Sequence, residues 1–374
     1  MRLGACRNAI VVAVIASSTL LADFAVRAQS TNPAAGSKAN GTKPPLSAAD
    51  QTIKDAFAKS KTAAKLDDYT EIITLCQDGI DKGAIPENTA YAKKLQGWAY
   101  NRRGEKRAES GDDKQALKDF ELAMRLDPTL WKAIQNHGVS KASLGDTKDA
   151  LDDFNAVIKA NPKYANAWYN RGELKYEEGD FNGAVQDYNQ ALMLEPGDPG
   201  FYNSRGHALY RLQRFREALN DYNQAVRIDP NDAAALVNRG DAFRDLGQYP
   251  QAAADYREAV RINPKLGRAY LSTAWLMATC ADSRFRDPDK AVSAAQRAID
   301  LDGDTDYRYL DTLAAAQANA GRFDDAKATA AKAVKAAPAS EVSHVRQHLD
   351  LFENNKAYRE GAPAEPVRSA SRPQ

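Results

Sequence analysis

The 374-residue sequence is poor in cysteine and histidine, with only three and four of them. These side chains build most zinc sites and many catalytic centres. The sequence also has no Gly-rich phosphate-binding loop, no Gly-x-Ser-x-Gly motif and no metal-binding cysteine quartet. His344 and His348 are spaced as two ligands on one helix face would be, but no Glu follows His344 and no Cys completes a set, so a solvated helix face is the preferred interpretation. We therefore expect a protein that is not an enzyme and that binds no metal and no cofactor.

An excess of charge is also absent, because 51 Lys and Arg residues are matched by 50 Asp and Glu residues. Without a strong field of either sign, nucleic acid and anionic membrane surfaces are disfavoured as partners. The apolar run at residues 9–22 is shorter than the roughly twenty residues that a membrane-spanning helix needs. We expect no integral membrane insertion once this run has been removed.

The apolar run has the features of an export signal. Arg2 and Arg7 precede it, and Val26-Arg27-Ala28 offers a small-residue cleavage site. Residues 1–28 are therefore predicted to be a cleavable signal peptide that leads to a periplasmic or secreted location, with an uncleaved anchor as the alternative. Cleavage would leave Cys76 and Cys280, which we expect to pack as small apolar residues without bridging. Residues 29–47 are rich in Pro, Gly, Ser and Asn and are predicted to be a flexible linker.

A unit of 34 residues, 165–198, recurs along most of the chain. When Ala165 is counted as position 1, position 8 is Gly, position 20 is Ala, position 24 is aromatic and position 32 is Pro. Five units follow one another without insertion from residue 97 to residue 266. The recurring residues are Gly104, Gly138, Gly172, Gly206 and Gly240; Ala116, Ala150, Ala184, Ala218 and Ala252; Phe120, Phe154, Tyr188, Tyr222 and Tyr256; and Pro128, Pro162, Pro196, Pro230 and Pro264.

These small, aromatic and proline positions resemble those of the tetratricopeptide repeat. The resemblance implies an all-α fold, a right-handed superhelical solenoid of helix-turn-helix repeats whose concave face binds a peptide or a partner protein. Positions 8 and 20 would be small because the two helices of a repeat approach closely there, and a larger residue would overpack the contact. The proline at position 32 cannot continue a helix and is expected to end the second one.

The repeat pattern also predicts how the chain is divided. Residues 48–96 form a degenerate first repeat and a connection, residues 97–266 the five regular repeats, and residues 267–306 a repeat with a loop insertion. In that insertion Asp287 and Pro288 suit the start of a delayed second helix. Residues 307–340 form the last repeat, residues 341–357 a capping helix and residues 358–374 a disordered tail.

Two charged positions change together along the repeats. Position 7 is cationic or imidazole wherever position 23 is Asp, and we expect each such side chain to pair with the Asp sixteen residues further on. The alternative is that both side chains point into water. The pairs are Arg103 and Asp119, His137 and Asp153, Arg171 and Asp187, Arg205 and Asp221, and Arg239 and Asp255.

By family analogy, positions 2, 5, 6, 9, 12 and 13 of the first helix face the concave groove. The residues predicted to bind a partner there are Lys132, Asn136, Tyr169, Asn170, Glu173, Tyr176, His207, Tyr210, Asn238, Arg244 and Trp275. Asn166, Arg211, Asp241 and Arg268 occupy further positions of the same set. The alternative for Tyr169, Tyr176, Tyr210 and Trp275 is that they pack between repeats.

One subfamily grips a C-terminal carboxylate with Lys and Asn side chains of successive repeats. Lys132, Asn136 and Asn170 resemble the first half of that clamp, but Gly200 and Ser204 stand where its third repeat has cations. Capture of a C-terminal carboxylate is therefore not predicted.

The sequence thus favours a non-catalytic scaffold or adaptor in the cell envelope that binds a partner peptide or protein in its groove. Two alternatives remain open. One is an assembly factor or chaperone for secreted or envelope complexes. The other is an architectural protein that self-associates as a homo-oligomer.

Overall fold

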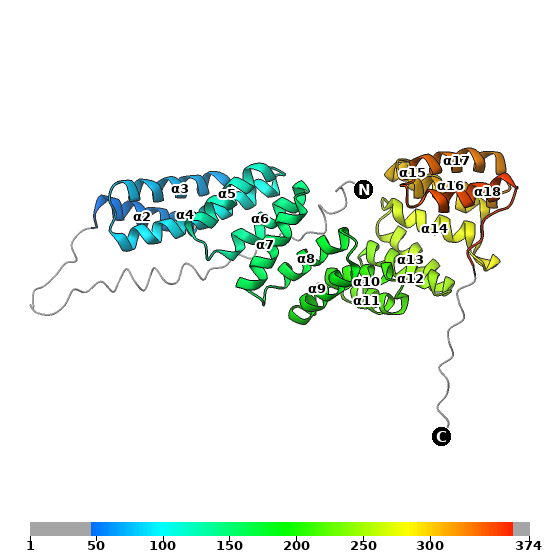
Figure 1. The fold of residues 1–374 in the computed structure, drawn as a ribbon, viewed down its shortest axis with the longest axis horizontal. Helices are drawn as coiled ribbons and strands as arrows, with labels where there is room; N and C mark the ends of the chain where they lie inside the picture. The colour runs from blue at the N-terminus through cyan, green and yellow to red at the C-terminus, as the bar shows by residue number, and fades with distance from the viewer. Residues whose placement is uncertain (1–45, 362–374) are drawn as a thin grey trace, which may run out of the picture. The chain divides into compact units, whose positions relative to one another are not determined.

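A computed structural model describes residues 46–361, and this part of the chain contains seventeen α-helices, one short 3-10 helix and no strand (Figure 1). The all-α prediction is confirmed. The predicted signal peptide, nearly all of the predicted linker and most of the predicted tail lie outside the described residues.

The chain forms two compact units, one ending at Gly179 and one beginning at Asp180. In each unit every helix packs against the next one along the chain, and first helices of successive repeats also touch. The first unit contains α2 (Ala48–Ser60), α3 (Leu66–Asp81), α4 (Pro86–Glu109), α5 (Asp113–Leu126), α6 (Trp131–Leu144), α7 (Thr147–Ala160) and α8 (Ala165–Glu177). The second contains α9 (Phe181–Leu194), α10 (Pro199–Arg211), α11 (Phe215–Ile228), α12 (Ala233–Asp245), α13 (Tyr249–Ile262), α14 (Gly267–Thr279), η3 (Ser283–Phe285), α15 (Pro288–Asp302), α16 (Tyr307–Asn319), α17 (Phe323–Ala336) and α18 (Val342–Glu353).

The aromatic residue at position 24 is the centre of each repeat. All five of these rings are at most 1% exposed. A Cβ atom built on Gly240 would lie 2.5 Å from the ring of Tyr256, and one on Gly206 would lie 2.8 Å from the ring of Tyr222. The glycine at position 8 is therefore required mainly by the ring at position 24, whereas the sequence pointed to the helix contact near position 20.

The predicted ion pairs form within the units. Arg103, Arg205 and Arg239 each bind the carboxylate of the Asp sixteen residues on through two nitrogens, at 2.6 to 3.0 Å. His137 Nδ1 lies 2.6 Å from Asp153. The fifth pair, Arg171 and Asp187, has one member in each unit and stays a prediction.

The arginine at position 7 also reaches the preceding repeat, which the sequence analysis missed. Its Nη1 donates to an Asn at position 25 of that repeat, at 2.6 Å from Arg171 to Asn155 and 2.7 Å from Arg205 to Asn189. Position 25 is Asn only where the following repeat has Arg at position 7. This covariation was visible in the sequence and would have predicted the contact.

The insertion in the 267 repeat behaves as predicted. Helix α15 begins at Pro288. The side chain of Asp287, its N-cap residue, accepts a hydrogen bond from the Lys290 amide at 3.1 Å. Cys76 and Cys280 are both buried and unbridged, as expected, and burial raises the pKa of the Cys76 thiol to about 12.

Three sequence-based interpretations differ from the structure near the end of the described chain. The capping helix predicted for residues 341–357 spans only Val342–Glu353, as α18. His344 is exposed, but His348 is 1% exposed, because its Nδ1 lies 3.0 Å from both carboxylate oxygens of Asp311 on α16. The sequence predicts a solvated helix face for His344 and His348, and for His348 this prediction is wrong. Residues 358–361 had been assigned to a disordered tail, yet Arg359 and Glu360 form hydrogen bonds to α14.

Candidate partner-binding face

The candidate site is the surface that the first helices of the repeats form in each unit, which we call the A-helix face of that unit. In the first unit it is formed by α4, α6 and α8, and in the second by α10, α12, α14 and α16.

In the first unit, polar side chains join α6 to α4. Asn136 Nδ2 donates to Asn101 Oδ1 and to Glu105 Oε1, at 3.0 Å each. Glu105 also pairs with Arg102. Lys132 is half-buried, and burial lowers the pKa of its ammonium group, with the charge of Arg102 adding to the shift and that of Glu105 opposing it. This part of the face combines close positive charges with a bound carboxylate.

On α8, three of the predicted contact residues are enclosed by the protein. Tyr169, Asn170 and Glu173 are buried, whereas Tyr176 is half-buried. The buried Tyr169 agrees with the alternative that it packs within the array. Tyr176 therefore offers the largest accessible area of these four side chains.

In the second unit, hydrogen bonds run from α10 through α12 to α14. The buried Asn238 donates to Asn203 at 2.8 Å. Asp241 accepts from Tyr256 Oη at 2.8 Å and from Arg268 Nη2 at 3.1 Å. These bonds link three consecutive repeats through positions that the repeat pattern predicted to face the groove.

Arg244 is the centre of this network. It lies 3.0 Å from Asp245 and 3.5 Å from Asp241, and Tyr210 Oη donates to Asp245. Burial disfavours its charged form, but Tyr256 and the two carboxylates raise the pKa of Arg244 well above its usual value. The guanidinium is thus a fixed positive charge.

His207, in contrast to Arg244, is uncharged at pH 7. Burial lowers its pKa to about 4, and the positive charges of Arg268 and Arg211 add to the effect. The Asp241 carboxylate opposes them, but the imidazole remains neutral at pH 7.

Trp275 on α14 is half-buried against the end of the described chain. Its ring centre lies 5.9 Å from that of His348 and 5.8 Å from that of Tyr358, and its Nε1–H group donates to Glu360. The repeat pattern gave Trp275 as a groove residue but gave no sign of Glu360, which lies outside the repeats.

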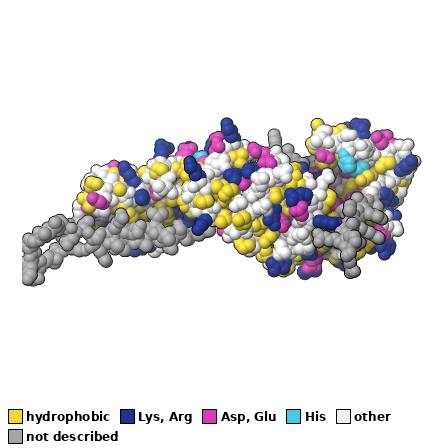
Figure 2. All heavy atoms as spheres, turned by 60° about the horizontal axis from the view of Figure 1, so that its bottom comes forward, with side chains coloured by type: hydrophobic (Ala, Val, Ile, Leu, Met, Phe, Trp, Pro, Cys, Tyr) yellow, Lys and Arg dark blue, Asp and Glu magenta, His cyan; other side chains and the backbone are white. Residues whose placement is uncertain are grey.

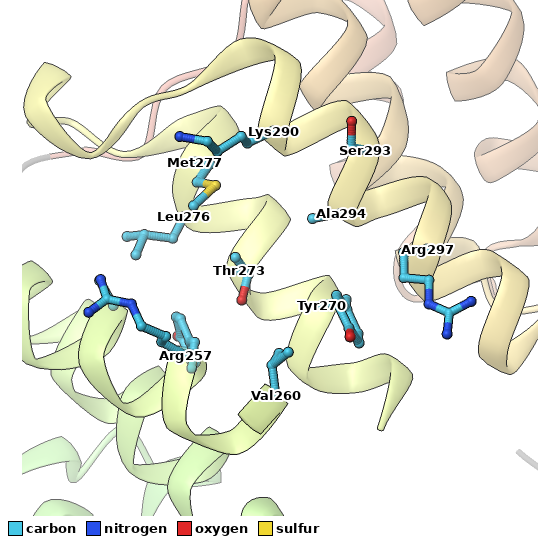
Figure 3. Close-up of a pocket in the computed structure, with 12 residues that line it drawn as sticks. Arg257, Val260, Tyr270, Thr273, Leu276, Met277, Lys290, Ser293, Ala294 and Arg297 are labelled. Atoms are coloured by element: carbon cyan, nitrogen blue, oxygen red, sulfur yellow. The ribbon is translucent and has the colours of Figure 1, made fainter. Parts of the chain in front are cut away.

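A cavity of about 420 Å³ lies on the other side of α14 (Figure 3). Tyr270, Thr273 and Met277 of α14 line it, together with Arg257 of α13 and Lys290 of α15. At 100° per residue these α14 positions lie about half a turn away from Trp275. Three helices contribute side chains to this cavity, and the pattern of the 34-residue unit gives no sign of it. The sequence therefore did not predict it.

Within residues 46–361, no three His, Cys, Asp or Glu side chains are grouped as a metal site would require. No helix in the same range combines the length and apolar content that crossing a bilayer demands. On the face drawn in Figure 2, basic and acidic side chains are interspersed over the described atoms.

The helices from α6 to α17 are each 13 to 15 residues long, and such helix pairs in sequence order define an α-helical repeat protein. Comparison with known families agrees: a tetratricopeptide repeat model matches residues 203–266 and a TPR repeat model matches residues 172–213. Residues 172–266 are therefore tetratricopeptide repeats.

Solved structures support the same fold. A tetratricopeptide repeat protein from Parabacteroides merdae is 18% identical, with a TM-score of 0.54, over 69% of this chain and 99% of that one. PilF of Pseudomonas aeruginosa is 19% identical, with a TM-score of 0.51, over 58% of this chain and 96% of that one. At these identities the likeness concerns the fold alone. No curated protein sequence matches this chain significantly.

Proposed function

We propose that the protein is a non-catalytic scaffold that binds a partner peptide or protein on its A-helix face. The observation that carries the proposal is the network on α10, α12 and α14. It holds half-buried aromatic and charged side chains, Tyr210, Arg244 and Trp275 among them, in fixed positions. Rigid aromatic and Arg side chains at the centre of a surface supply most of the affinity in protein interfaces.

Part of this face keeps accessible charge. The Arg268 side chain is 42% exposed while it holds Asp241 at 3.1 Å. A guanidinium carries five N–H groups, so the four that do not bind Asp241 can donate to a ligand. An extended peptide with carboxylate or carbonyl groups fits such donors.

We further propose a periplasmic or secreted location, and hence a partner in the cell envelope. The support is the sequence of residues 1–28 alone. An assembly factor for envelope complexes and a self-associating architectural protein are the alternatives. Fractionation of the native cell, with N-terminal sequencing of the recovered protein, tests the location. A chain recovered only from the cytoplasm with residue 1 intact would contradict it.

Site-specific photo-crosslinking tests the binding face. A crosslinking residue placed at His207, Tyr210 or Arg268 of the second unit should capture one and the same partner from envelope extract. A crosslinker at Arg261, which is 67% exposed on the second helix of its repeat, is the matched position off the face and should not capture it. Capture of another copy of this chain would favour the architectural alternative.

Affinity then provides the quantitative test. The substitution Arg268→Glu should weaken partner binding at least tenfold because it reverses a charge on the face. The same change at Arg261, whose ion pair with Glu258 lies within one helical turn, should leave binding unchanged. Equal effects of the two substitutions would place the binding surface elsewhere.

A further inference from the structure

After α18 the chain turns back towards α14. Asn355 has a φ of 54°, in the left-handed region. The Lys356 amide donates to the Leu351 carbonyl and the Asn355 amide to the Phe352 carbonyl, each at 2.9 Å. These two bonds form a Schellman motif, which directs residues 356–360, the return segment, onto the A-helix face.

The first anchor of the return segment is the Tyr358 ring. Its centre lies 4.2 Å from that of His348 and 5.8 Å from that of Trp275. Tyr358 also packs against the apolar cluster of α16, α17 and α18. Its ring therefore sits in an aromatic site whose other members belong to α14 and α18.

The second anchor is Glu360. Its amide donates to the Thr279 carbonyl at the end of α14, at 2.9 Å. Its carboxylate accepts from Trp275 Nε1 and lies 3.6 Å from Arg244 Nε. The carboxylate thus meets an indole N–H group and a guanidinium whose positive charge is fixed.

Between the anchors, Arg359 is exposed, whereas Tyr358 and Glu360 are half-buried. Its guanidinium donates to the Ala278 carbonyl at 3.1 Å and to Asn319 Oδ1 at 2.6 Å. An alternation of this kind, with main-chain bonding and every second side chain in a pocket, is how extended peptides are recognised. The return segment therefore occupies the face as a bound peptide would.

We propose that the surface around Trp275, Arg244 and His348 is a binding site for an extended peptide with an aromatic residue two positions before a Glu or Asp. The return segment fills this site as an intramolecular ligand, and a partner peptide of the same chemistry displaces it. This inference rests on the proposed function, since it names the ligand class for one part of the A-helix face.

The competition has a quantitative consequence. A short tether gives the return segment an effective concentration on the order of millimolar. A partner peptide must displace the return segment. The apparent Kd of the peptide for the intact chain therefore equals its Kd for the vacated site divided by the fraction of chains in which the return segment has left the site. Weakening the return segment should therefore strengthen binding of a peptide added in trans.

The test uses a fluorescent, end-capped peptide with the sequence of residues 354–361, NNKAYREG, and the full chain. In one variant Tyr358→Ala and Glu360→Gln together vacate the site. In the matched control, Glu353→Gln and Lys356→Ala change two exposed side chains, one before the return segment and one at its first residue. By fluorescence anisotropy the peptide should bind the vacated variant at least tenfold more tightly than the intact chain or the control. A peptide with Tyr→Ala or Glu→Gln should lose at least tenfold in affinity.

The indole N–H signal of Trp275 in an NMR spectrum reports occupancy directly. Glu360→Gln alone, a milder change, should move that signal in the intact chain, and adding the peptide to the vacated variant should move it back. Adding Trp275→Phe to the vacated variant should weaken peptide binding at least tenfold.

Two results would overturn the inference: an unmoved Trp275 signal in the Glu360→Gln chain, or no peptide binding to a vacated variant that melts as the intact chain does. Capture of a partner through His207 or Arg268 would still support the proposed function in that case. Loss of that capture with intact peptide binding would contradict the proposed function alone.

Discussion

At the scale of single residues, the charge pairs of positions 7 and 23 show how a repeat tolerates charge against a partner helix. The Asp255 side chain is 9% exposed and that of Arg239 is 21% exposed. Two parallel N–H···O bonds at 2.7 Å join them. A bidentate pair satisfies both groups, and Asn223 of the preceding repeat takes a third N–H direction at 3.4 Å.

Asp255→Ala should lower the free energy of unfolding by about 2 kcal/mol, because it leaves a largely enclosed guanidinium without its carboxylate. Urea unfolding followed by circular dichroism measures the change. The matched control is Glu258→Ala, which removes the partner of the exposed Arg261 and should leave the midpoint unchanged. Equal losses in the two variants would mean that the enclosed pair contributes no more than a solvated one.

The candidate site was predictable at this scale only in part. The resemblance to the tetratricopeptide repeat implied that Tyr210, Arg244 and Trp275 lie on the A-helix face, because they occupy positions that face the groove in that family. It did not show that Asn170 is fully buried. Burial depends on how closely the next repeat packs, and helical periodicity carries no information about that distance.

At the scale of elements, the turn between the two helices of a repeat passes through the left-handed backbone region at position 15. The φ values there are 73 to 89° for Gly111, Gly145, Gly247 and Gly321. In the repeat that begins at residue 199 the same position is Gln213, with φ 58°. A side chain with a Cβ atom costs about 1 to 2 kcal/mol in this conformation.

Gln213→Gly should therefore raise the free energy of unfolding by about 0.5 to 1 kcal/mol, after the greater freedom of Gly in the unfolded chain is subtracted. Thermal and urea unfolding measure the gain. The reciprocal change, Gly247→Gln in the next repeat, should lower stability by a similar amount. A destabilised Gln213→Gly chain would show that the Gln side chain makes contacts worth more than the backbone strain.

Element boundaries followed closely from local signals. Asp287 and Pro288 marked the start of a helix in the sequence, and α15 does begin at Pro288. Caps, prolines and glycines act on neighbouring residues only, so they can be recognised without the tertiary structure. The turn of the chain at Asn355 depends on a positive φ in a residue other than Gly, which is why it went unpredicted.

At the scale of the whole molecule, the neutral His207 couples stability to pH. Its pKa is lowered to about 4 in the folded chain, whereas an unfolded His titrates near 6.5. Above pH 6.5 neither state binds the proton, and the full stability is present. Between pH 6.5 and about 4 the unfolded chain takes up a proton that the folded chain excludes, so the free energy of unfolding falls as pH falls.

His207→Gln should reduce the loss of stability between pH 7 and pH 5 by about 1 to 2 kcal/mol. Urea unfolding at the two pH values measures this. Arg268→Gln removes a nearby positive charge that lowers the pKa of His207, and it should give a smaller reduction. If the intact chain and the His207→Gln chain lose the same stability, the folded and unfolded chains protonate His207 alike, and folding does not lower the pKa of this imidazole.

The sequence by itself determined the repeat length, the helix pairs, the buried rings at position 24 and the Arg–Asp pairs. All of these are set by residues within one 34-residue unit, where backbone periodicity fixes which side chains meet. Only the tertiary structure decided that His348 binds Asp311, 37 residues away, and that Trp275 meets Glu360, 85 residues away. Such contacts depend on how successive repeats stack and on where the chain turns back. Neither can be recognised from the sequence pattern of a single repeat.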